Sequence, residues 1–194
     1  MFQVSQISQE KLESSLARLR PAYDPLAQYI EEAACGLAWE DNQSGALLVA
    51  RNPERGTHAY DVTLFPPTEE LAAEQLVGYL NRPIPRDLRE FFRHSNGAFL
   101  GELSIYGILY RRSRSARAPL DIGMGSLWRS SYAACDEDFV LFASRNVSDD
   151  GQVGYFLSDQ GLVLARGNEK LKAPADSGIW PSFNDWLRHQ LSQD

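Results

Sequence analysis

Residues 84–107, IPRDLREFFRHSNGAFLGELSIYG, decide how this sequence folds. Pro85 is well suited to open a helix, because its ring fixes a compatible backbone angle and its missing N–H is not needed there. The apolar side chains that follow recur at i, i+3 and i+4, as Leu88, Phe91 and Phe92. Gly97 is a natural helix stop, since glycine accepts a left-handed backbone that most residues resist. The stretch therefore predicts a helix, a glycine stop and a strand, and it contains no recognisable catalytic motif.

The order of elements around this stretch predicts an α+β fold. Helical periodicity appears before residue 36 and at the C-terminus, whereas several runs rich in β-branched and aromatic residues follow one another directly. Strands in runs favour a mainly antiparallel sheet with helices packed on one face. The expected helices are 8–19, 25–35, 69–81, 86–96, 125–135 and a last one capped by Ser182, and the expected strands are 45–52, 57–65, 102–110, 138–144, 153–158 and 162–166.

The composition is that of an ordinary globular chain. Hydrophobic residues make up 43% and charged residues 23%, and no run approaches the roughly 18 apolar residues that a membrane helix needs. The N-terminus lacks the basic and apolar regions of a secretory signal, which predicts a cytoplasmic protein without membrane association. The two cysteines have no second cysteine or histidine at finger spacing, so we expect no metal and no other cofactor.

The charges of the chain are unevenly distributed. The formal net charge is −7, with acidic segments 1–82 and 121–194 flanking a basic segment 83–120. An acidic body disfavours direct binding to nucleic acid, because phosphate recognition needs a basic face. It favours the attraction of a basic protein partner. The arginine-rich loop 111–117 is interpreted as an exposed or salt-bridging segment and not as an RNA-binding arm.

The candidate catalytic patterns in the sequence are incomplete. Gly123 and Gly125 lack the third glycine, or the Gly-Lys-Ser/Thr step, of a phosphate loop. The nucleophile elbow G-x-S-x-G does not occur. His94 and His189 lie near the expected ends of helices, where interaction with the helix dipole is a sufficient reason for a histidine. A hydrolase that pairs His94 with an acidic residue stays open as an alternative.

The ordered motifs of residues 67–191 resemble the SUKH superfamily, the Smi/Knr-like domains. In that family an Ile-Pro or Leu-Pro step leads into a helix that ends at Asn-Gly, and a strand ending near Tyr-Gly follows. The later runs VGYFLSDQGLVLAR and WPSFNDWL are similar to the strand-turn-strand and the closing helix of the family. The residues to which this resemblance assigns structural roles are Pro85, Asn96, Gly97, Gly107, Ser182, Phe183 and Trp186.

The resemblance implies a non-enzymatic protein-binding domain. Bacterial members are mostly immunity proteins that neutralise a cognate toxin, often a nuclease, and other relatives act as regulatory or scaffold modules. We therefore expect an immunity protein that occludes the active site of a basic toxin domain, and a regulatory or scaffold module for an endogenous partner is the alternative. Acidic side chains and aromatic anchors are expected to form the binding surface. The expected partner-binding residues are Glu102, Tyr106, Tyr110, Asp136, Glu137, Asp138, Asp149 and Asp150.

The sequence departs from the family pattern ahead of residue 67. Residues 1–66 predict a helix pair and a β-hairpin that have no counterpart in the minimal domain, and 67–194 are assigned to the SUKH-like α+β domain. The extension is expected to pack on the core, with a separate partner-binding lobe as the alternative. The loop 111–117 also lengthens the middle region.

Overall fold

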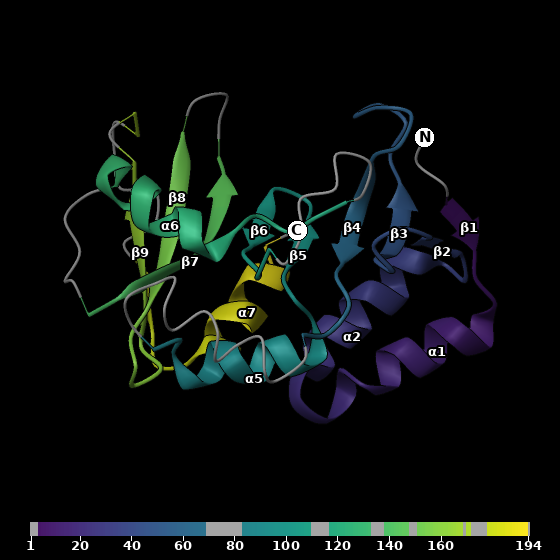
Figure 1. Ribbon diagram of the computed structural model, residues 1–194, viewed down its shortest axis with the longest axis horizontal. Coiled ribbons are helices and arrows are strands. Elements are labelled where there is room, and N and C mark those ends of the chain that lie inside the picture. Colours follow the sequence, from purple (N-terminus) through teal and green to yellow (C-terminus); the bar gives the residue numbers. More distant parts are fainter. Residues whose placement is uncertain are drawn as a thin grey trace.

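The computed structural model shows a ten-stranded antiparallel sheet in which the spatial order of the strands follows the chain (Figure 1). The structure describes residues 4–68, 83–109, 117–132, 138–147, 151–168, 170–171 and 178–193. The strands are β1 (Val4–Gln6), β2 (Ala38–Asp41), β3 (Leu47–Arg51), β4 (Tyr60–Leu64), β5 (Ala98–Leu100), β6 (Leu103–Ile105), β7 (Val140–Asn146), β8 (Gln152–Leu157), β9 (Val163–Gly167) and β10 (Ile179–Trp180). The predicted α+β class and antiparallel sheet are confirmed.

Helices cover the two faces of this sheet unequally. The helices α1 (Gln9–Ala17), α2 (Arg20–Ala34), α5 (Arg86–His94) and α7 (Phe183–Leu191) lie together on one face (Figure 1). The helix α6 (Ile122–Trp128) and the 3₁₀ turn η1 (Arg129–Ser131) pack on the opposite face at β7 and β8. Neighbouring residues of β8 mark the two sides: Tyr155 meets Trp186 of α7 with 5.2 Å between ring centroids, whereas Phe156 meets Tyr132 at 5.8 Å.

The two parts of the sequence on either side of residue 66 share this sheet. β4 pairs with β5 in the register Val62↔Leu100 and Leu64↔Ala98. Just beyond β4, the Phe65 N–H donates to the carbonyl of Gly97 at 3.2 Å. Buried residues from both parts also belong to one hydrophobic cluster. Residues 4–66 therefore pack on the common core, and the hydrogen-bonded ladder runs across the expected boundary.

Aromatic rings hold the helices against the sheet. Trp186 is fully buried and lies edge-on to Phe142 of β7, with 4.7 Å between ring centroids. Phe183, one turn earlier, contacts Phe91 of α5 at 5.3 Å and Tyr23 of α2 at 6.1 Å. Complete burial of a large apolar side chain contributes roughly 1.5–3 kcal/mol. This cluster is therefore a major reason why α2, α5 and α7 gather on one face.

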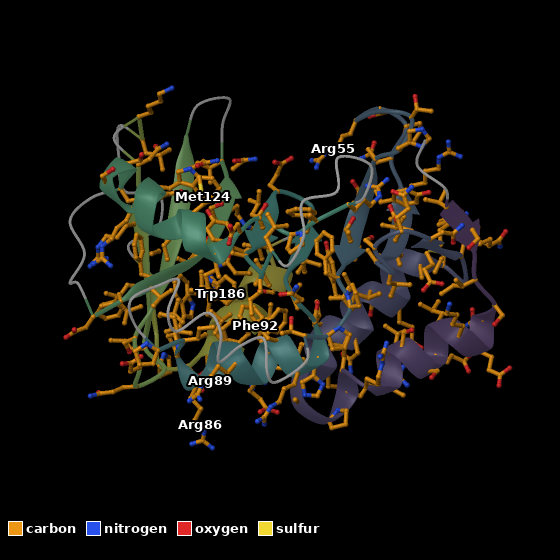
Figure 2. The ribbon with its side chains drawn as sticks, in the orientation of Figure 1. Arg55, Arg86, Arg89, Phe92, Met124 and Trp186 are labelled. Atoms are coloured by element: carbon orange, nitrogen blue, oxygen red, sulfur yellow. The ribbon has the colours of Figure 1, made fainter. Side chains whose placement is uncertain are left out.

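Helix α5 is the amphipathic helix that the stretch 84–107 predicts. Pro85 is its N-cap, and the apolar residues at i, i+3 and i+4 are buried. Arg86 and Arg89 point away from the sheet, whereas Phe92 points toward it (Figure 2). The expected helix 69–81 lies outside the described residues.

The Asn-Gly step after α5 joins separate segments of the chain as well as ending the helix. Gly97 has φ +88°, and a Cβ there would lie 2.8 Å from the carbonyl oxygen of Ile105. The buried Asn96 amide donates to the carbonyl of Ile108 at 2.9 Å and accepts from its N–H at 2.6 Å. A Cβ on Gly107 would stand 2.3 Å from the Asn96 carbonyl oxygen. We call Asn96, Gly97, Gly107 and Ile108 the Asn96 clamp.

The C-terminal elements agree with their sequence signals, whereas β1, β2, β5 and β10 are absent from the sequence predictions. The Ser182 hydroxyl accepts from the Asp185 N–H at 3.1 Å and donates to its carboxylate at 2.6 Å, which confirms the predicted cap. Phe183 and Trp186 are buried, as expected for the inner face of α7. β1, β2, β5 and β10 are only two to four residues long, too short for a periodic signal.

Gly107→Ala is expected to lower the free energy of unfolding by about 3 kcal/mol, the upper end of the usual cost of overpacking, because the added methyl group has to displace backbone. Urea denaturation measures this loss. The matched control is Gly36→Asn, which keeps a residue that tolerates positive φ at a site with open space around it. The control should lose less than about 1 kcal/mol. A similar small loss at both positions would contradict the close packing of the clamp.

Candidate functional site

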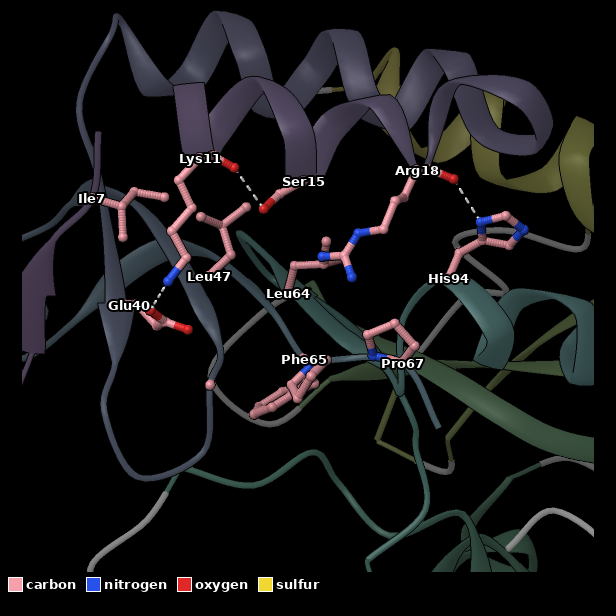
Figure 3. A pocket seen from close by; sticks show the side chains of 12 residues that line it. Ile7, Lys11, Ser15, Arg18, Glu40, Leu47, Leu64, Phe65, Pro67 and His94 are labelled. Atoms are coloured by element: carbon pink, nitrogen blue, oxygen red, sulfur yellow. Dashed lines mark hydrogen bonds and ion pairs between the residues drawn. The ribbon is translucent and has the colours of Figure 1, made fainter. Parts of the chain in front are cut away.

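Helix α1 covers a pocket at the end of the sheet formed by β2, β3 and β4 (Figure 3). The pocket has a volume of about 250 Å³. Its apolar walls come from Ile7, Leu47, Leu64, Phe65, Pro66 and Pro67. Its polar side chains are Lys11, Ser15, Arg18, Glu40 and His94. An apolar concavity with a few converging polar groups is the usual form of a small-molecule site.

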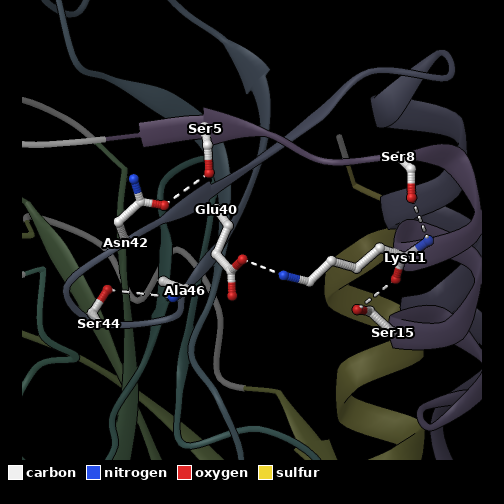
Figure 4. Close-up of polar contacts among 8 residues, drawn as sticks. All are labelled: Ser5, Ser8, Lys11, Ser15, Glu40, Asn42, Ser44 and Ala46. Carbon is white, nitrogen blue, oxygen red and sulfur yellow. Dashed lines mark hydrogen bonds and ion pairs between the residues drawn. The ribbon is translucent and has the colours of Figure 1, made fainter.

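Three of the polar side chains of the pocket lie on one face of α1 and its C-cap. Lys11, Ser15 and Arg18 lie at i, i+4 and i+7 and therefore project to the same side of the helix. The ammonium group of Lys11 forms an ion pair with the carboxylate of Glu40 in β2 (Figure 4). The guanidinium group of Arg18 extends from the end of α1 over the pocket (Figure 3). It has no hydrogen-bond or ion-pair partner among the residues that the structure describes.

Local hydrogen bonds fix α1 above the strands (Figure 4). The Ser8 hydroxyl caps the helix by accepting from the Lys11 N–H at 3.2 Å. The Ser15 hydroxyl donates to the Lys11 carbonyl at 2.9 Å. In β1, the Ser5 hydroxyl donates to Oδ1 of Asn42 at 2.8 Å, which holds the edge strand to the turn after β2. The cap and these bonds together determine where the side chains of α1 meet the sheet.

His94 lines the far end of the pocket. Its Nδ1 lies 2.7 Å from the carbonyl oxygen of Arg18 and therefore carries the proton, while Nε2 lies 3.6 Å from the Glu90 carboxylate. Ser15, the hydroxyl on the pocket wall, donates to a carbonyl of its own helix. A general base has to lie within hydrogen-bond reach of the nucleophile. Ser15 and His94 do not form such a pair, so the geometry lends no support to a hydrolase built on them.

Of the residues that the sequence assigns to a binding surface, the structure describes Glu102, Tyr106 and Asp138. Glu102 and Asp138 are exposed. Glu102 follows β5, forms an ion pair with Arg55 and accepts a hydrogen bond from Asn146 at 3.3 Å. The remaining candidates lie outside the described residues: they are Tyr110, Asp136, Glu137, Asp149 and Asp150.

Tyr106 is not a surface anchor, and this prediction is wrong. The residue is only 1% exposed, and its hydroxyl donates to the buried Ser144 hydroxyl at 3.0 Å. Its ring packs edge-on to Trp128 of α6 at 5.7 Å. Burial raises the pKa of Tyr106, and that of Tyr132 beside it, above the ordinary tyrosine value. Tyr106 is thus a core residue beneath α6.

A partly exposed aromatic surface, absent from the sequence predictions, lies on the side of β2–β5 opposite α1 and α2. Trp39 and Tyr60 approach each other with 5.6 Å between ring centroids. Phe99 packs edge-on to the buried Phe65 at 5.5 Å, and Val4 of β1 joins the same cluster. We call Val4, Trp39, Tyr60 and Phe99 the aromatic face. Each of these four side chains keeps part of its surface open to solvent.

Arg117 anchors the end of the arginine-rich segment beside the aromatic face. Its guanidinium lies 5.3 Å from the ring centroid of Tyr60 and donates to the carbonyl of His58. Its Nε lies 3.4 Å from Oδ2 of Asp41, which is completely buried. Oδ1 of Asp41 accepts two backbone N–H groups of the following turn, at 2.9 and 3.0 Å. The contact to Oδ2 has the length of an ion pair without hydrogen-bond geometry, so Arg117 acts on Asp41 mainly through charge.

The described residues hold no group of three or more His, Cys, Asp or Glu side chains arranged to bind a metal ion. None of the helices in this part of the chain is long and apolar enough to cross a bilayer. Comparisons with protein-family models, curated proteins and solved structures find no match to this chain. Membership of the SUKH superfamily therefore stays a prediction from the sequence motifs.

Arg117→Met is expected to lower the free energy of unfolding by about 3–5 kcal/mol, because the buried Asp41 carboxylate loses its countercharge. Arg55→Met is the matched control: it breaks the exposed ion pair with Glu102 and should cost less than about 1 kcal/mol. Urea denaturation of both variants makes the comparison. Adding Asp41→Asn to Arg117→Met should restore part of the loss. Equal, small losses in the two arginine variants would contradict the charge pairing.

Proposed function

We propose that this protein binds another protein through the aromatic face and acts as an immunity protein of the SUKH type, neutralising a basic toxin domain by covering its active site. The observation that carries this proposal is the partly exposed cluster of Trp39, Tyr60 and Phe99. Large aromatic side chains are the usual anchors of protein interfaces, where they supply most of the binding energy. The motif resemblance supports the choice of an immunity protein among protein-binding functions.

The aromatic face is suited to binding because its side chains are already ordered. Trp39 and Tyr60 rise from the paired strands β2, β3 and β4, and Phe99 lies on β5 next to them. Ring contacts restrict these side chains before any partner arrives. Binding therefore loses little side-chain entropy, a cost that reaches about 0.5–1.5 kcal/mol for each mobile side chain at an interface.

The charge of the chain supports a basic partner. A net charge of −7 attracts a basic domain over distances beyond direct contact and speeds its association. The exposed Glu102 lies in the turn between β5 and β6, close along the chain to Phe99, and adds a carboxylate to this acidic surface. A toxin domain that binds nucleic acid needs a basic surface around its active site. An acidic protein docked there blocks access of the substrate.

The proposal is tested by co-expression with a toxin encoded beside the gene in its native genome. We expect the protein to restore growth and to form a stoichiometric complex with the toxin domain in size-exclusion chromatography. A neighbouring toxin that stays active would contradict the proposal. Capture of a single endogenous protein, without any effect on a toxin, would instead support the regulatory or scaffold alternative.

Trp39→Ala is expected to weaken the complex at least about tenfold, because it removes a central aromatic anchor. Ile179→Ala is the matched control, since Ile179 is an exposed apolar residue at the other edge of the sheet, 65% accessible to solvent. Titration calorimetry with the isolated toxin domain measures both affinities, and urea denaturation confirms that both variants fold. Unchanged affinity in Trp39→Ala would move the interface away from the aromatic face.

A further inference from the structure

We propose that the pocket beneath α1 binds a small monocarboxylate with a short hydrocarbon body, held by the guanidinium group of Arg18. This site is separate from the aromatic face and does not depend on the immunity function. It rests on the charge balance of the pocket, on its apolar walls and on its size.

The charge balance of the pocket leaves one positive group available. Lys11 is already paired with Glu40, so these two charges largely cancel. Arg18 has no such partner among the described residues, and Figure 3 shows its guanidinium directed over the pocket. A guanidinium group offers donors in a planar fork that matches the two oxygens of a carboxylate. The complementary ligand is therefore a single anion.

The backbone of Arg18 is held in place beside the pocket. Arg18 is the C-cap of α1, and its N–H donates to the carbonyl of Leu16. Its own carbonyl is 2.7 Å from Nδ1 of His94 at the end of α5. The side chain thus starts from a backbone that both helices fix, which limits the region that its guanidinium group can reach.

The walls of the pocket select an apolar body for the ligand. Leu47 and Leu64 come from β3 and β4, and the chain then continues through Phe65 into Pro66 and Pro67. These groups offer no charge and few donors, so they favour hydrocarbon over a second polar group. The ligand therefore has its charged end at Arg18 and its apolar end among these side chains.

Size and charge together exclude larger and more highly charged ligands. The volume of about 250 Å³ lies below the range of about 300–1,000 Å³ that is typical for drug-sized ligands. A nucleotide is larger than the pocket and carries several negative charges. A phosphate monoester carries up to two negative charges at neutral pH, whereas Arg18 supplies a single positive charge once Lys11 is paired with Glu40. A carboxylate with about five or six carbon atoms satisfies both limits.

Isothermal titration calorimetry with sodium 4-methylpentanoate tests this inference on the full chain. We expect saturable one-to-one binding with a dissociation constant on the order of 1 mM, which is realistic for so small a ligand. Arg18→Gln should weaken binding at least about tenfold, since it removes a charge-assisted pair of hydrogen bonds. Arg18→Lys should fall between Arg18→Gln and the unaltered protein, because lysine keeps the charge and loses the fork.

Arg20→Gln is the matched control for these variants. Arg20 lies two residues further along the chain, pairs with Glu31 and is not part of the pocket wall. It should leave binding of 4-methylpentanoate unchanged. The neutral 4-methylpentanamide should bind at least about tenfold more weakly, because the charged partner of Arg18 is missing.

Three results would overturn the inference. The first is the absence of saturable binding of 4-methylpentanoate to the unaltered chain at tens of millimolar. The second is equal binding by Arg18→Gln and Arg20→Gln when urea denaturation shows both to be folded. The third is tighter binding of 3-methylbutyl phosphate than of 4-methylpentanoate, which would assign the pocket to a different anion.

Discussion

The pair of hydrogen bonds between the Asn96 amide and the backbone of Ile108 is the interaction on which the rest of the structure depends. Both groups are buried, and a buried amide that loses its partners costs about 1–3 kcal/mol for each unsatisfied group. On its other side the same segment holds the end of β4, because Asn96 N–H donates to the Pro66 carbonyl at 3.2 Å. The Ser95 hydroxyl adds a bond of 3.0 Å to the carbonyl of Phe65. Three distant parts of the chain thus meet at one asparagine.

This junction explains where both candidate surfaces lie. It aligns β4, β5 and β6, so that the sheet continues from the N-terminal strands into the C-terminal ones. It also sets the end of α5, which brings His94 beneath α1 and forms one end of the pocket. Because α1 and α2 pack on one side of β2–β5, the other side of these strands is left to Trp39, Tyr60 and Phe99.

Sequence reasoning succeeds here where the signal is local. Helix α5, the strands β7, β8 and β9 and the cap of α7 each carry their information within about ten residues. β1, β2 and β10 are strands only because a neighbour pairs with them, so their short sequences give no periodic signal. Trp39 belongs to β2, so its sequence context gives no alternation that would predict a partly exposed side chain.

Burial explains the prediction that failed and the site that was missed. Tyrosine serves equally well as an interface anchor and as a core residue with a bonded hydroxyl, and only the fold decided that Tyr106 lies under α6. The pocket, too, could be identified only from the tertiary structure, because its lining residues come from distant parts of the chain. In the sequence alone, Lys11 and Arg18 have the pattern of ordinary solvated charges on a helix. The fold brings Glu40 of β2 next to Lys11, and this contact distinguishes the two cations. Their different roles follow from which of the two meets a carboxylate.

The pocket and the aromatic face use opposite sides of the same strands, which makes them separable by mutation. In β2, Trp39 belongs to the aromatic face and Glu40 to the pocket, as the alternation of a strand requires. Phe65 is the exception, because its buried ring packs on Phe99 while the residue also lines the pocket. Residues in contact couple energetically, whereas distant ones add independently. Changes at Phe65 would therefore disturb both surfaces at once, and Trp39 and Arg18 are the positions at which each surface is altered alone.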